Sequence, residues 1–572
     1  MTRNETLAAL RERPDIAVLI IGGGINGISV FRELALQGVD VLLAEKGDYC
    51  GGASAALSRM VHGGLRYLEN GEFKLVKESL LERDRLLRNA PHYVAPLPTT
   101  VPIFDIFSGI ANGAVRFLGL TRRPSRRGAV VIKAGLTLYD VFTASRRLMP
   151  VHRFRGARET LKTWPAINPA TRSSATYYDA WVSRPERLGL EMLNDAMAAS
   201  PSAQALNYVQ VGSNADGLIL TDTISGETLP VRPRLVINAT GGWIDLTNAA
   251  IGAAAPRMMG GTKGSHIIVD NRELYDALAG QMIYYENEDG RICILFPYLG
   301  KVLIGSTDIR VDDPDQVRCE DDELQYILQS LAFVFPSIEI APEEIVFRFA
   351  GVRPLPASDD SFTGRIPRDH FCEFVEASGH LPATLCMIGG KWTTFRSFGA
   401  LAADMSLERL GLSRKVGTED MAIGGGRNFP PDTVVWCAEL AAEHKISEAR
   451  AQVLLERYGT SARDVAAGLS VASDAMLPGC DYSEGEIRLI VEREQVETLA
   501  DIFLRRTTIA ITGDLTSELV DAVLDLLATR KNWDAGQASR ERAAFLALLK
   551  HQHGVDLSNP SKTDKKRSAI CA

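Results

Sequence analysis

Several common signatures are missing from this chain. Its eight cysteines are scattered, with no C-x-x-C pair and no grouping of cysteine and histidine at the spacing of a zinc site. Disulfide-held secreted domains and zinc-binding domains place their cysteines in such patterns. The cysteines therefore suit a reducing compartment, and we expect neither a disulfide framework nor a bound metal.

Long hydrophobic runs and a surplus of positive charge are also lacking. No stretch is apolar over the roughly 20 residues that a membrane-spanning helix needs. The apolar run at 16–21 leads directly into a glycine turn, which predicts a strand and not a signal peptide. With 63 basic and 71 acidic residues the formal charge is −8, which gives no support for nucleic-acid binding. We expect a cytoplasmic protein, free or lying on the cytoplasmic face of a membrane.

The 572 residues are too many for one hydrophobic core. Patterns of strand, turn and helix prevail up to about residue 400. Segments rich in Ala, Leu, Glu and Arg with helical periodicity follow. We therefore predict a first unit over 1–400, a helical domain over 401–555 and a disordered, polar tail over 556–572.

The most informative feature that is present is a glycine motif near the N-terminus. Residues 18–21 predict a strand, residues 22–27 fit G-x-G-x-x-G, and an amphipathic stretch predicts the helix that follows. Such glycines allow a tight turn, close approach of the backbone to a pyrophosphate, and close packing of helix on strand. Glu45 ends the next strand, where an acid bonds a ribose hydroxyl. This context predicts a dinucleotide-binding unit.

Two more turns of the same kind lie at 239–243 and 388–391, each following an apolar strand. A nicotinamide enzyme usually needs only the first turn. A flavin adenine dinucleotide is long and stays bound, so several separated turns close around it. The three turns together favour FAD as the cofactor.

Six motifs, taken in order from about residue 15 to 400, resemble those of the FAD-dependent glycerol-3-phosphate dehydrogenases. As a set they are highly specific, and Leu499–Thr507 is a weaker echo of the helical C-terminal domain of that family. The motifs are Gly22–Gly27 with Glu45, Arg59-Met-Val-His-Gly-Gly-Leu-Arg-Tyr-Leu-Glu69, Lys263-Gly-Ser-His-Ile-Ile-Val269, Gly305-Ser-Thr-Asp308, Gly351-Val-Arg-Pro-Leu355 and Gly389-Gly-Lys-Trp-Thr-Thr-Phe-Arg396.

The resemblance implies a fold of the α/β plus α class. An FAD-binding, Rossmann-like domain of the glutathione-reductase type would be interleaved with an antiparallel-sheet substrate domain at about 85–180 and 245–385, followed by the helical domain. The implied reaction oxidises sn-glycerol 3-phosphate to dihydroxyacetone phosphate. Electrons would pass from the flavin to a membrane quinone or, in some members, to oxygen. The sequence leaves the oligomeric state open, with a homodimer as one option.

Alcohol oxidation needs a base for the hydroxyl proton, and histidine suits that role near neutral pH. His266 matches the active-site histidine of the family, although without its motif a satisfied core histidine would be the simpler interpretation. Arg353 matches the arginine near the reacting hydroxyl, where a cation stabilises a developing alkoxide. Guanidinium groups also suit the phosphate. The residues expected to bind the substrate are Arg66, Tyr67, Arg368 and Lys391.

Lys391 also follows two glycines at a predicted helix start. The positive end of that helix should face the flavin pyrimidine and stabilise the reduced-flavin anion, and a plain helix N-terminus is the alternative. The residues expected to bind FAD are Gly22, Gly23, Gly24, Asn26, Gly27, Glu45, Ser54, Ser58, His62, Gly63, Gly64, Thr240, Gly241, Gly390, Lys391 and Thr393.

Two segments depart from the family pattern. Where the family has Thr-Ser-Ser-x-Ser-Ser-Lys, this chain has Ala53-Ser-Ala-Ala-Leu-Ser-Arg59, which loses several hydroxyls. The family pattern Asp-x-Trp-Val-Asp-Asp-Ala-Arg-Leu becomes Asp179-Ala-Trp-Val-Ser-Arg-Pro-Glu-Arg-Leu188, with an extra residue and no paired acids. If the second segment borders the substrate, a longer polyol phosphate such as erythritol 4-phosphate is an alternative substrate.

Two other functions stay open from the residues alone. Amine and amino-acid oxidases share the N-terminal fingerprint, and a flavin-binding paralogue without enzymatic activity would carry it too. Membrane contact is a further hypothesis, since the apolar stretch Val101–Leu120 precedes a basic cluster. That pattern predicts either docking on anionic lipid or a buried helix with a solvated loop. The basic cluster consists of Arg122, Arg123, Arg126 and Arg127.

Overall fold

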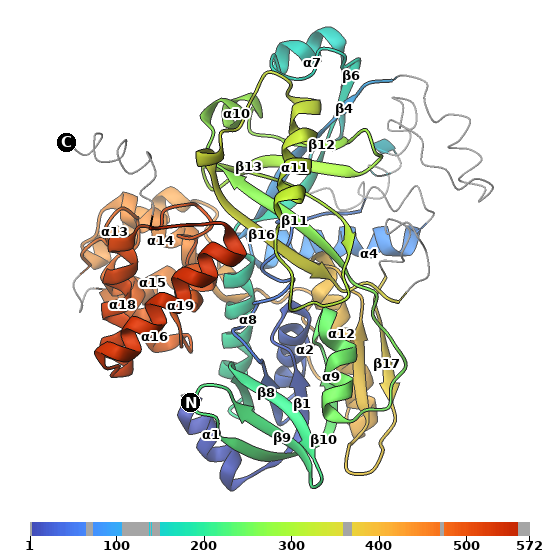
Figure 1. The fold of residues 1–572 in the computed structure, drawn as a ribbon, viewed down its shortest axis with the longest axis vertical. Helices are drawn as coiled ribbons and strands as arrows, with labels where there is room; N and C mark the ends of the chain where they lie inside the picture. Colours follow the sequence, from blue (N-terminus) through green and yellow to red (C-terminus); the bar gives the residue numbers. More distant parts are fainter. Residues whose placement is uncertain are drawn as a thin grey trace.

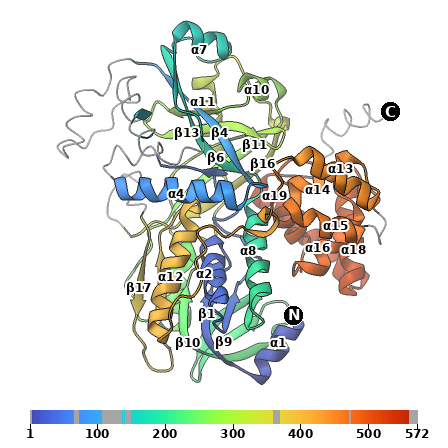
Figure 2. The same ribbon diagram turned by 180° about the vertical axis from the view of Figure 1, so that it is seen from behind.

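The computed structural model describes residues 3–64, 72–105, 136–137, 139, 149–357, 369–469 and 474–558. The chain forms two β-sheets, one below the other in the view of Figure 1, and a helical domain that lies beside them. Figure 2 shows helix α4 (Phe73–Asn89) crossing between the two sheet regions. No helix in these ranges is long and apolar enough to cross a bilayer.

The first sheet is built around the N-terminal strand. Parallel pairs join β1 to β2 and to β10, β2 to β7, and β10 to β18, so the carboxyl ends of these strands meet at one edge. In spatial order the strands are β17 (Phe371–Val375), β18 (Thr384–Ile388), β10 (Thr228–Asn238), β1 (Asp15–Ile21), β2 (Val41–Ala44) and β7 (Ala203–Leu206), with β9 (Gly217–Asp222) and β8 (Val209–Asn214) attached through β10.

Strand β1 is apolar on both faces because both are covered. Val18 and Ile20 belong to the core beneath three helices, whereas Leu19 and Ile21 belong to the core under β8, β9, α1 and α9. Side chains alternate along a strand, which explains why neighbouring residues enter different cores. The helices are α2 (Ile25–Leu36), α8 (Pro185–Ala199) and α12 (Phe395–Leu410) on the first face, and α1 (Arg3–Glu12) and α9 (Ile244–Ile251) on the second.

The second sheet is antiparallel except for the parallel pair β4–β12. Its strands come from segments that interrupt the first sheet in sequence, and the expected α/β plus α class with interleaved sheets is confirmed. The strands are β15 (Ile309–Arg310), β11 (Thr262–Val269), β14 (Lys301–Gly305), β13 (Ile292–Tyr298), β12 (Met282–Glu286), β4 (Val94–Ile103), β6 (Ser173–Val182) and β3 (Met60–Val61), with β16 (Ile345–Arg353) beside β11 and β5 (Arg153–Gly156) beside β6.

The two faces of the second sheet have different neighbours. On one face, Ile267 and Val269 of β11 share a core with Leu331 of α11. On the other face, Ile268 and Phe347 share a core with the C-terminal helices. The helices on the first face are α7 (Ala157–Thr163), α10 (Arg272–Ala277) and α11 (Asp321–Val334).

The C-terminal helices begin at short polar residues that cap them. Ser483 and Asp534 each form a reciprocal capping box with the residue three positions on. The predicted boundary at residue 400 falls inside α12, which packs on the first sheet through Phe398 and Ala402. The domain contains α13 (Thr433–His444), α14 (Glu448–Tyr458), α15 (Ala462–Leu469), α16 (Glu484–Arg493), α17 (Leu499–Asp501), a π-helical turn (Ile502–Arg506), α18 (Ser517–Lys531) and α19 (Ala535–His553).

Candidate active site

The first glycine turn has room for backbone only. Gly22 has a φ of +109°, and a Cβ atom on Gly27 would lie 1.9 Å from the carbonyl oxygen of Gly22. Glu45 fixes this turn, because its carboxylate accepts the N–H of Gly23 at 2.6 Å. The Ser54 hydroxyl accepts the N–H of Ile25 at 2.9 Å, at the start of α2. The turn is thus a cradle of backbone N–H groups at a helix N-terminus, which suits a pyrophosphate.

The three predicted turns converge. A Cβ atom on Gly22 would lie 2.8 Å from the carbonyl oxygen of Ala239, just before Thr240 and Gly241 of the second turn. Gly390 of the third turn approaches the side chain of Asn26, where its Cβ would lie 3.1 Å from Nδ2. Segments far apart in sequence therefore surround one site, as expected for a long dinucleotide.

Two polar atoms at this site support the fit of a bound ligand. Among the described residues, Oδ1 of Asn26 and Nε1 of Trp392 are buried and have no hydrogen-bond partner. Buried polar groups are nearly always bonded, so each of these atoms is suited to a ligand atom. Together with the cradle, they show that the residues present fit the expected dinucleotide.

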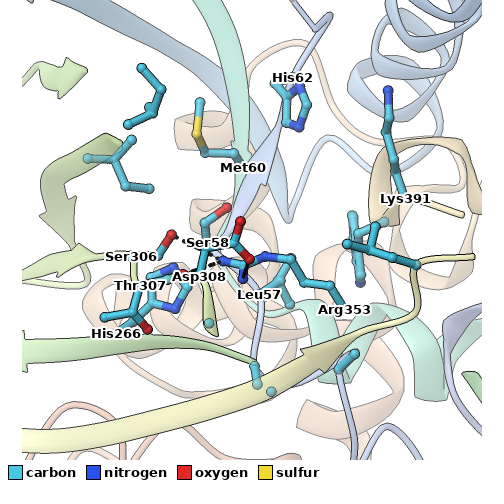
Figure 3. A pocket seen from close by; sticks show the side chains of 18 of the residues that line it. Leu57, Ser58, Met60, His62, His266, Ser306, Thr307, Asp308, Arg353 and Lys391 are labelled. Atoms are coloured by element: carbon cyan, nitrogen blue, oxygen red, sulfur yellow. Dashed lines mark hydrogen bonds and ion pairs between the residues drawn. The ribbon is translucent and has the colours of Figure 1, made fainter. Parts of the chain in front are cut away.

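Next to the third turn lies a cavity of about 620 Å³ between the two sheets. Figure 3 shows His62, His266, Arg353 and Lys391 around this cavity. His62 donates its backbone N–H to the hydroxyl of Thr393 at 3.3 Å, which joins the His-Gly-Gly segment to the third turn. Further cavity-lining residues from the predicted cofactor set are Ser58, Gly64, Gly390 and Thr393.

Strand register places His266 on a sheet face that lines the cavity. On β11 it lies opposite Gly305 of β14 and Phe349 of β16, and Ile294 and Tyr284 continue the same row across β13 and β12. The imidazole stacks on Phe349, with ring centroids 5.1 Å apart and an interplanar angle of 13°. Gly305 leaves the space that the imidazole occupies.

Replacing Gly305 with alanine should displace the His266 ring. The new Cβ would lie 2.2 Å from Cδ2 of His266, so the ring must move. We expect a yellow protein whose flavin is reduced by substrate roughly 100-fold more slowly, since misplacement by about 1 Å has that effect. Stopped-flow measurement of flavin reduction tests this. Gly212→Ala on β8, whose Cβ would make only an ordinary contact with Ile219 at 3.9 Å, is the matched control, and an unchanged rate in Gly305→Ala would contradict the placement of His266.

Arg353 shares the cavity face with His266. Its guanidinium crosses Gly264, where a Cβ atom would lie 2.1 Å from Nη2. Arg353 donates to a carboxylate oxygen of Asp308 at 3.0 Å, to the hydroxyl of Ser306 at 3.2 Å and to the carbonyl oxygen of Thr307 at 3.0 Å. The Gly-Ser-Thr-Asp motif therefore orients this guanidinium.

A buried ion pair also contacts the Gly-Ser-Thr-Asp motif. Lys263 and Glu323 pair at 2.7 Å, and Glu323 also accepts the hydroxyl of Thr307 at 2.6 Å and that of Ser265 at 2.8 Å. Glu323 lies in the first turn of α11, inside its capping box. Glu323 thus bonds both the Lys-Gly-Ser-His and the Gly-Ser-Thr-Asp motif to the N-terminus of α11.

The environment of His266 differs from the expectation of a pKa near neutrality. Neither ring nitrogen has a hydrogen-bond partner among the described residues. Burial, followed by the positive charges of Arg353 and Arg59, lowers the pKa of His266 to about 3. The imidazole is therefore neutral at physiological pH, with a lone pair available to a proton. A bound dianion would offset the two guanidinium charges.

The buried, neutral state of His266 predicts acid sensitivity. Because its pKa is about 3 in the folded protein and about 6.5 when unfolded, the unfolded state binds more protons between these values. Lowering the pH from 7 to about 5 should thus cost the folded state about 2 kcal/mol through this group. Urea unfolding at both pH values should show a smaller decline for His266→Phe than for wild type. The exposed-site variant His380→Phe should decline as wild type does, and an identical decline in His266→Phe would refute the prediction.

The structure does not bring every predicted residue to this site. Arg66, Tyr67 and Arg368 lie outside the described residues. Gly63 is not among the cavity-lining residues, but its N–H donates at 2.8 Å to Asp179, which is. Lys391 lines the cavity, but a short 3₁₀ turn (Trp392–Thr394) separates it from the start of α12.

The two departing segments have different places. Residues 53–58, called here the cavity wall, contribute Ala53, Ala56, Leu57 and Ser58 to the lining. Residues 183–186 are not among the lining residues of this cavity; the backbone N–H of Ser183 bonds the carbonyl oxygen of Tyr93, and Glu186 bonds Arg59. Asp179, at the start of the second segment, does line the cavity, so that segment borders the candidate site although its altered residues 183–186 do not.

Several lining residues were missed from the sequence. Arg310 follows the Gly-Ser-Thr-Asp motif by two positions, and that proximity is a signal that could have identified it. Tyr177, Tyr284 and Arg291 lie on or beside strands in no recognisable motif. The strand register places Tyr177 and Tyr284 on this face, and Arg291 lies just before β13.

Comparison with known proteins places this geometry in context. Residues 17–396 match the family described as FAD dependent oxidoreductase, and residues 416–538 match the C-terminal domain of alpha-glycerophosphate oxidase. The glycerol-3-phosphate dehydrogenase of Synechocystis is 32% identical over 548 residues, covering 92% of this chain and 94% of that protein. The D-erythritol 1-phosphate dehydrogenase of Brucella abortus is 31% identical over 513 residues, covering 86% and 93%.

The fold also matches a solved structure. The glycerol-3-phosphate dehydrogenase from Bacillus halodurans, complexed with FAD, superposes with a TM-score of 0.74 at 22% identity, covering 96% of this chain and 97% of that one. At that identity the likeness concerns the fold alone.

Proposed function

Because this chain belongs to the family of FAD-dependent glycerol-3-phosphate dehydrogenases, we propose that it oxidises sn-glycerol 3-phosphate to dihydroxyacetone phosphate. The observation that carries the proposal is the presence of His266 and Arg353 on one sheet face, in the cavity beside the converging turns. Family membership makes the protein an FAD-dependent oxidoreductase. The substrate and the final electron acceptor are the proposed part.

The residues divide the chemistry between them. Bound FAD supplies the acceptor for the hydride that leaves the alcohol carbon. His266 is neutral and its ring nitrogens are unbonded, so the imidazole takes the hydroxyl proton. Arg353, held in place by Asp308 and Ser306, places positive charge where the oxygen becomes negative.

The lining charges suit a phosphorylated substrate. Arg291, Arg310, Arg353 and Lys391 border the cavity, and guanidinium groups bind phosphate oxygens in pairs. The phosphate dianion would offset the two guanidinium charges that lower the pKa of His266, and so would raise its basicity when substrate binds. Roles for Arg66, Tyr67 and Arg368 in binding phosphate remain part of this proposal.

A longer polyol phosphate is the second candidate. Ala53, Ala56 and Leu57 give the cavity wall small or apolar side chains where the family pattern has hydroxyls. The relative from Brucella abortus carries the name of an erythritol phosphate dehydrogenase. Both observations support an erythritol phosphate, which would use the same base and the same arginines.

One anaerobic titration tests the substrate. Glycerol 3-phosphate, erythritol 4-phosphate, erythritol 1-phosphate and sarcosine are added in turn to the purified holoenzyme, and the visible flavin absorbance is followed. Bleaching by glycerol 3-phosphate at the lowest concentration supports the first candidate, and stronger bleaching by an erythritol phosphate supports the second. Bleaching by sarcosine alone, or by none of the four, would reject a polyol-phosphate dehydrogenase.

For the acceptor we propose a membrane quinone, reached by peripheral contact from the cytoplasmic face. Reduced enzyme should be reoxidised faster by a short-chain quinone than by oxygen, and the reverse order would contradict this. The segment expected to dock, Val101–Leu120 with the arginines that follow, lies outside the described residues from residue 106 onward. Co-sedimentation with anionic liposomes tests docking, and no binding at low salt rejects it.

A further inference from the structure

The two segments that depart from the family pattern meet in space. Arg59 ends the first and Glu186 lies in the second, and their side chains form a two-pronged ion pair. Nη1 donates to Oε2 at 2.8 Å, and Nη2 lies 2.8 Å from Oε1. Both side chains are buried, with 4% and 10% of their surface exposed. Such fork-to-carboxylate pairs fix both groups in one plane.

Arg59 also holds the cavity wall. Its Nη2 donates to the carbonyl oxygen of Ala55 at 3.1 Å, inside that wall. Its own carbonyl oxygen accepts the N–H of Val182 at 2.8 Å, at the end of β6. The wall in turn reaches the dinucleotide cradle, because Ser54 accepts the N–H of Ile25. Arg59 therefore connects α8 and the wall through its guanidinium, and the wall and the second sheet through its backbone carbonyl.

The same guanidinium lies against the aromatic support of His266. It is 5.9 Å from the ring centroid of Phe349 and 5.6 Å from that of Tyr298. Phe349 is the ring on which His266 stacks. Tyr298 donates its hydroxyl to the carbonyl oxygen of Ser183 at 2.8 Å, so the second departing segment touches this stack as well. Cation–π contacts of this kind are favourable where water is excluded.

We propose that Arg59 and Glu186 are a pair of positioning residues, which fix the cavity wall and the ring of His266 relative to each other. Neither touches the reacting atoms; both act through the wall and through Phe349. For its effect on turnover the inference rests on the proposed function. The effect of the Arg59–Glu186 pair on the cavity wall does not depend on the proposed function.

Because the charge of Arg59 acts on His266, loss of the Arg59–Glu186 pair should change how activity depends on pH. Arg353 faces the imidazole from β16 and is paired with Asp308. Arg59 faces it from the segment before β3 and is paired with Glu186. Removing the second pair leaves the first, so the imidazole should become easier to protonate and the acid limb of the activity profile should move to higher pH.

Two variants and one control separate position from mere stability. The double variant Arg59→Met/Glu186→Met removes both charges without leaving one buried and unpaired. Arg59→Lys keeps the charge but loses the fork. The control Arg187→Met/Glu494→Met removes another Arg–Glu pair from the same helix, 2.6 Å apart and with 8% and 10% exposure, whose residues do not line the cavity.

Two measurements are made on each holoenzyme: amide hydrogen exchange of the peptide spanning the wall, and flavin reduction by the polyol phosphate across pH. We expect exchange in the wall to rise at least tenfold in the double variant and in Arg59→Lys, and to stay unchanged in the control. We expect kcat to fall roughly 10- to 100-fold in the double variant, with KM changing less. Only the double variant should move the acid limb upward.

The inference is overturned if the double variant and Arg59→Lys match the control in wall exchange, or if all reduction profiles are those of wild type. Should the double variant not fold, Arg59→Lys decides through its exchange and its kcat. If no polyol phosphate reduces the wild-type flavin, the proposed function fails, while the exchange measurement still tests the pair.

Discussion

Arg353→Met is expected to give a yellow protein whose flavin glycerol 3-phosphate reduces roughly 10³-fold more slowly than in wild type. The guanidinium is oriented in advance by Asp308, Ser306 and Thr307, so it stabilises negative charge on the substrate oxygen without having to reorganise. Loss of one such donor commonly costs 10²- to 10³-fold, and this group also attracts the phosphate. Rapid-mixing measurement of flavin reduction at saturating substrate is the test.

The matched control for that variant is Arg348→Met on the same strand. Arg348 lies opposite Ile267 and pairs with Asp321 at 2.7 Å, on the face of β16 turned away from His266. It should keep the wild-type rate. A colourless Arg353→Met protein would instead assign Arg353 a structural role in holding the cofactor, and a wild-type rate would remove it from the mechanism.

Gly27→Val should be colourless as purified. A Cβ atom at this position would lie 1.9 Å from the carbonyl oxygen of Gly22 and 3.1 Å from its carbonyl carbon. Both are backbone atoms of the turn, so no flexible side chain can move aside. The turn must open, and the N–H groups that would surround the pyrophosphate lose their arrangement. The ratio of visible flavin absorbance to protein absorbance measures the effect.

Gly156→Ala provides the control for this second variant, since its Cβ would meet nothing within 4 Å. It should retain full flavin. Circular dichroism should show both variants folded, because α2 keeps its apolar face toward the first sheet. A yellow Gly27→Val protein would mean that the cradle tolerates a side chain, and the assignment of this turn to the cofactor would then be wrong.

The sequence sufficed for features that are local or that belong to a specific motif. The strand, glycine turn and helix at 18–36 follow from neighbouring residues, as does the placement of Glu45 at the end of β2. His266 and Arg353 were predicted from their motifs, and both line the cavity. Their presence on one face follows from period-two alternation along β11 and β16, once the pairing of these strands is known.

What the sequence did not predict depends on contacts between distant segments. The pKa of His266 falls because burial and Arg59 act on it, and nothing near residue 266 in sequence indicates either. Tyr284 reaches the cavity through strand pairing, and Arg291 through the hairpin that joins β12 to β13. In the sequence, the two segments that depart from the family pattern look like independent changes. In the structure, Arg59 of the first and Glu186 of the second form an ion pair. Pairing between segments is decided by the whole fold and leaves no local pattern.

The second sheet has a further consequence for how this protein can be divided. Ile268 and Phe347, buried under the C-terminal helices, lie next along their strands to the row that contains His266. A shortened chain ending after α12 would expose this apolar sheet face to water, and we expect it to aggregate. Chimaeras between relatives should therefore take the oxidoreductase domain and the helical domain from the same parent.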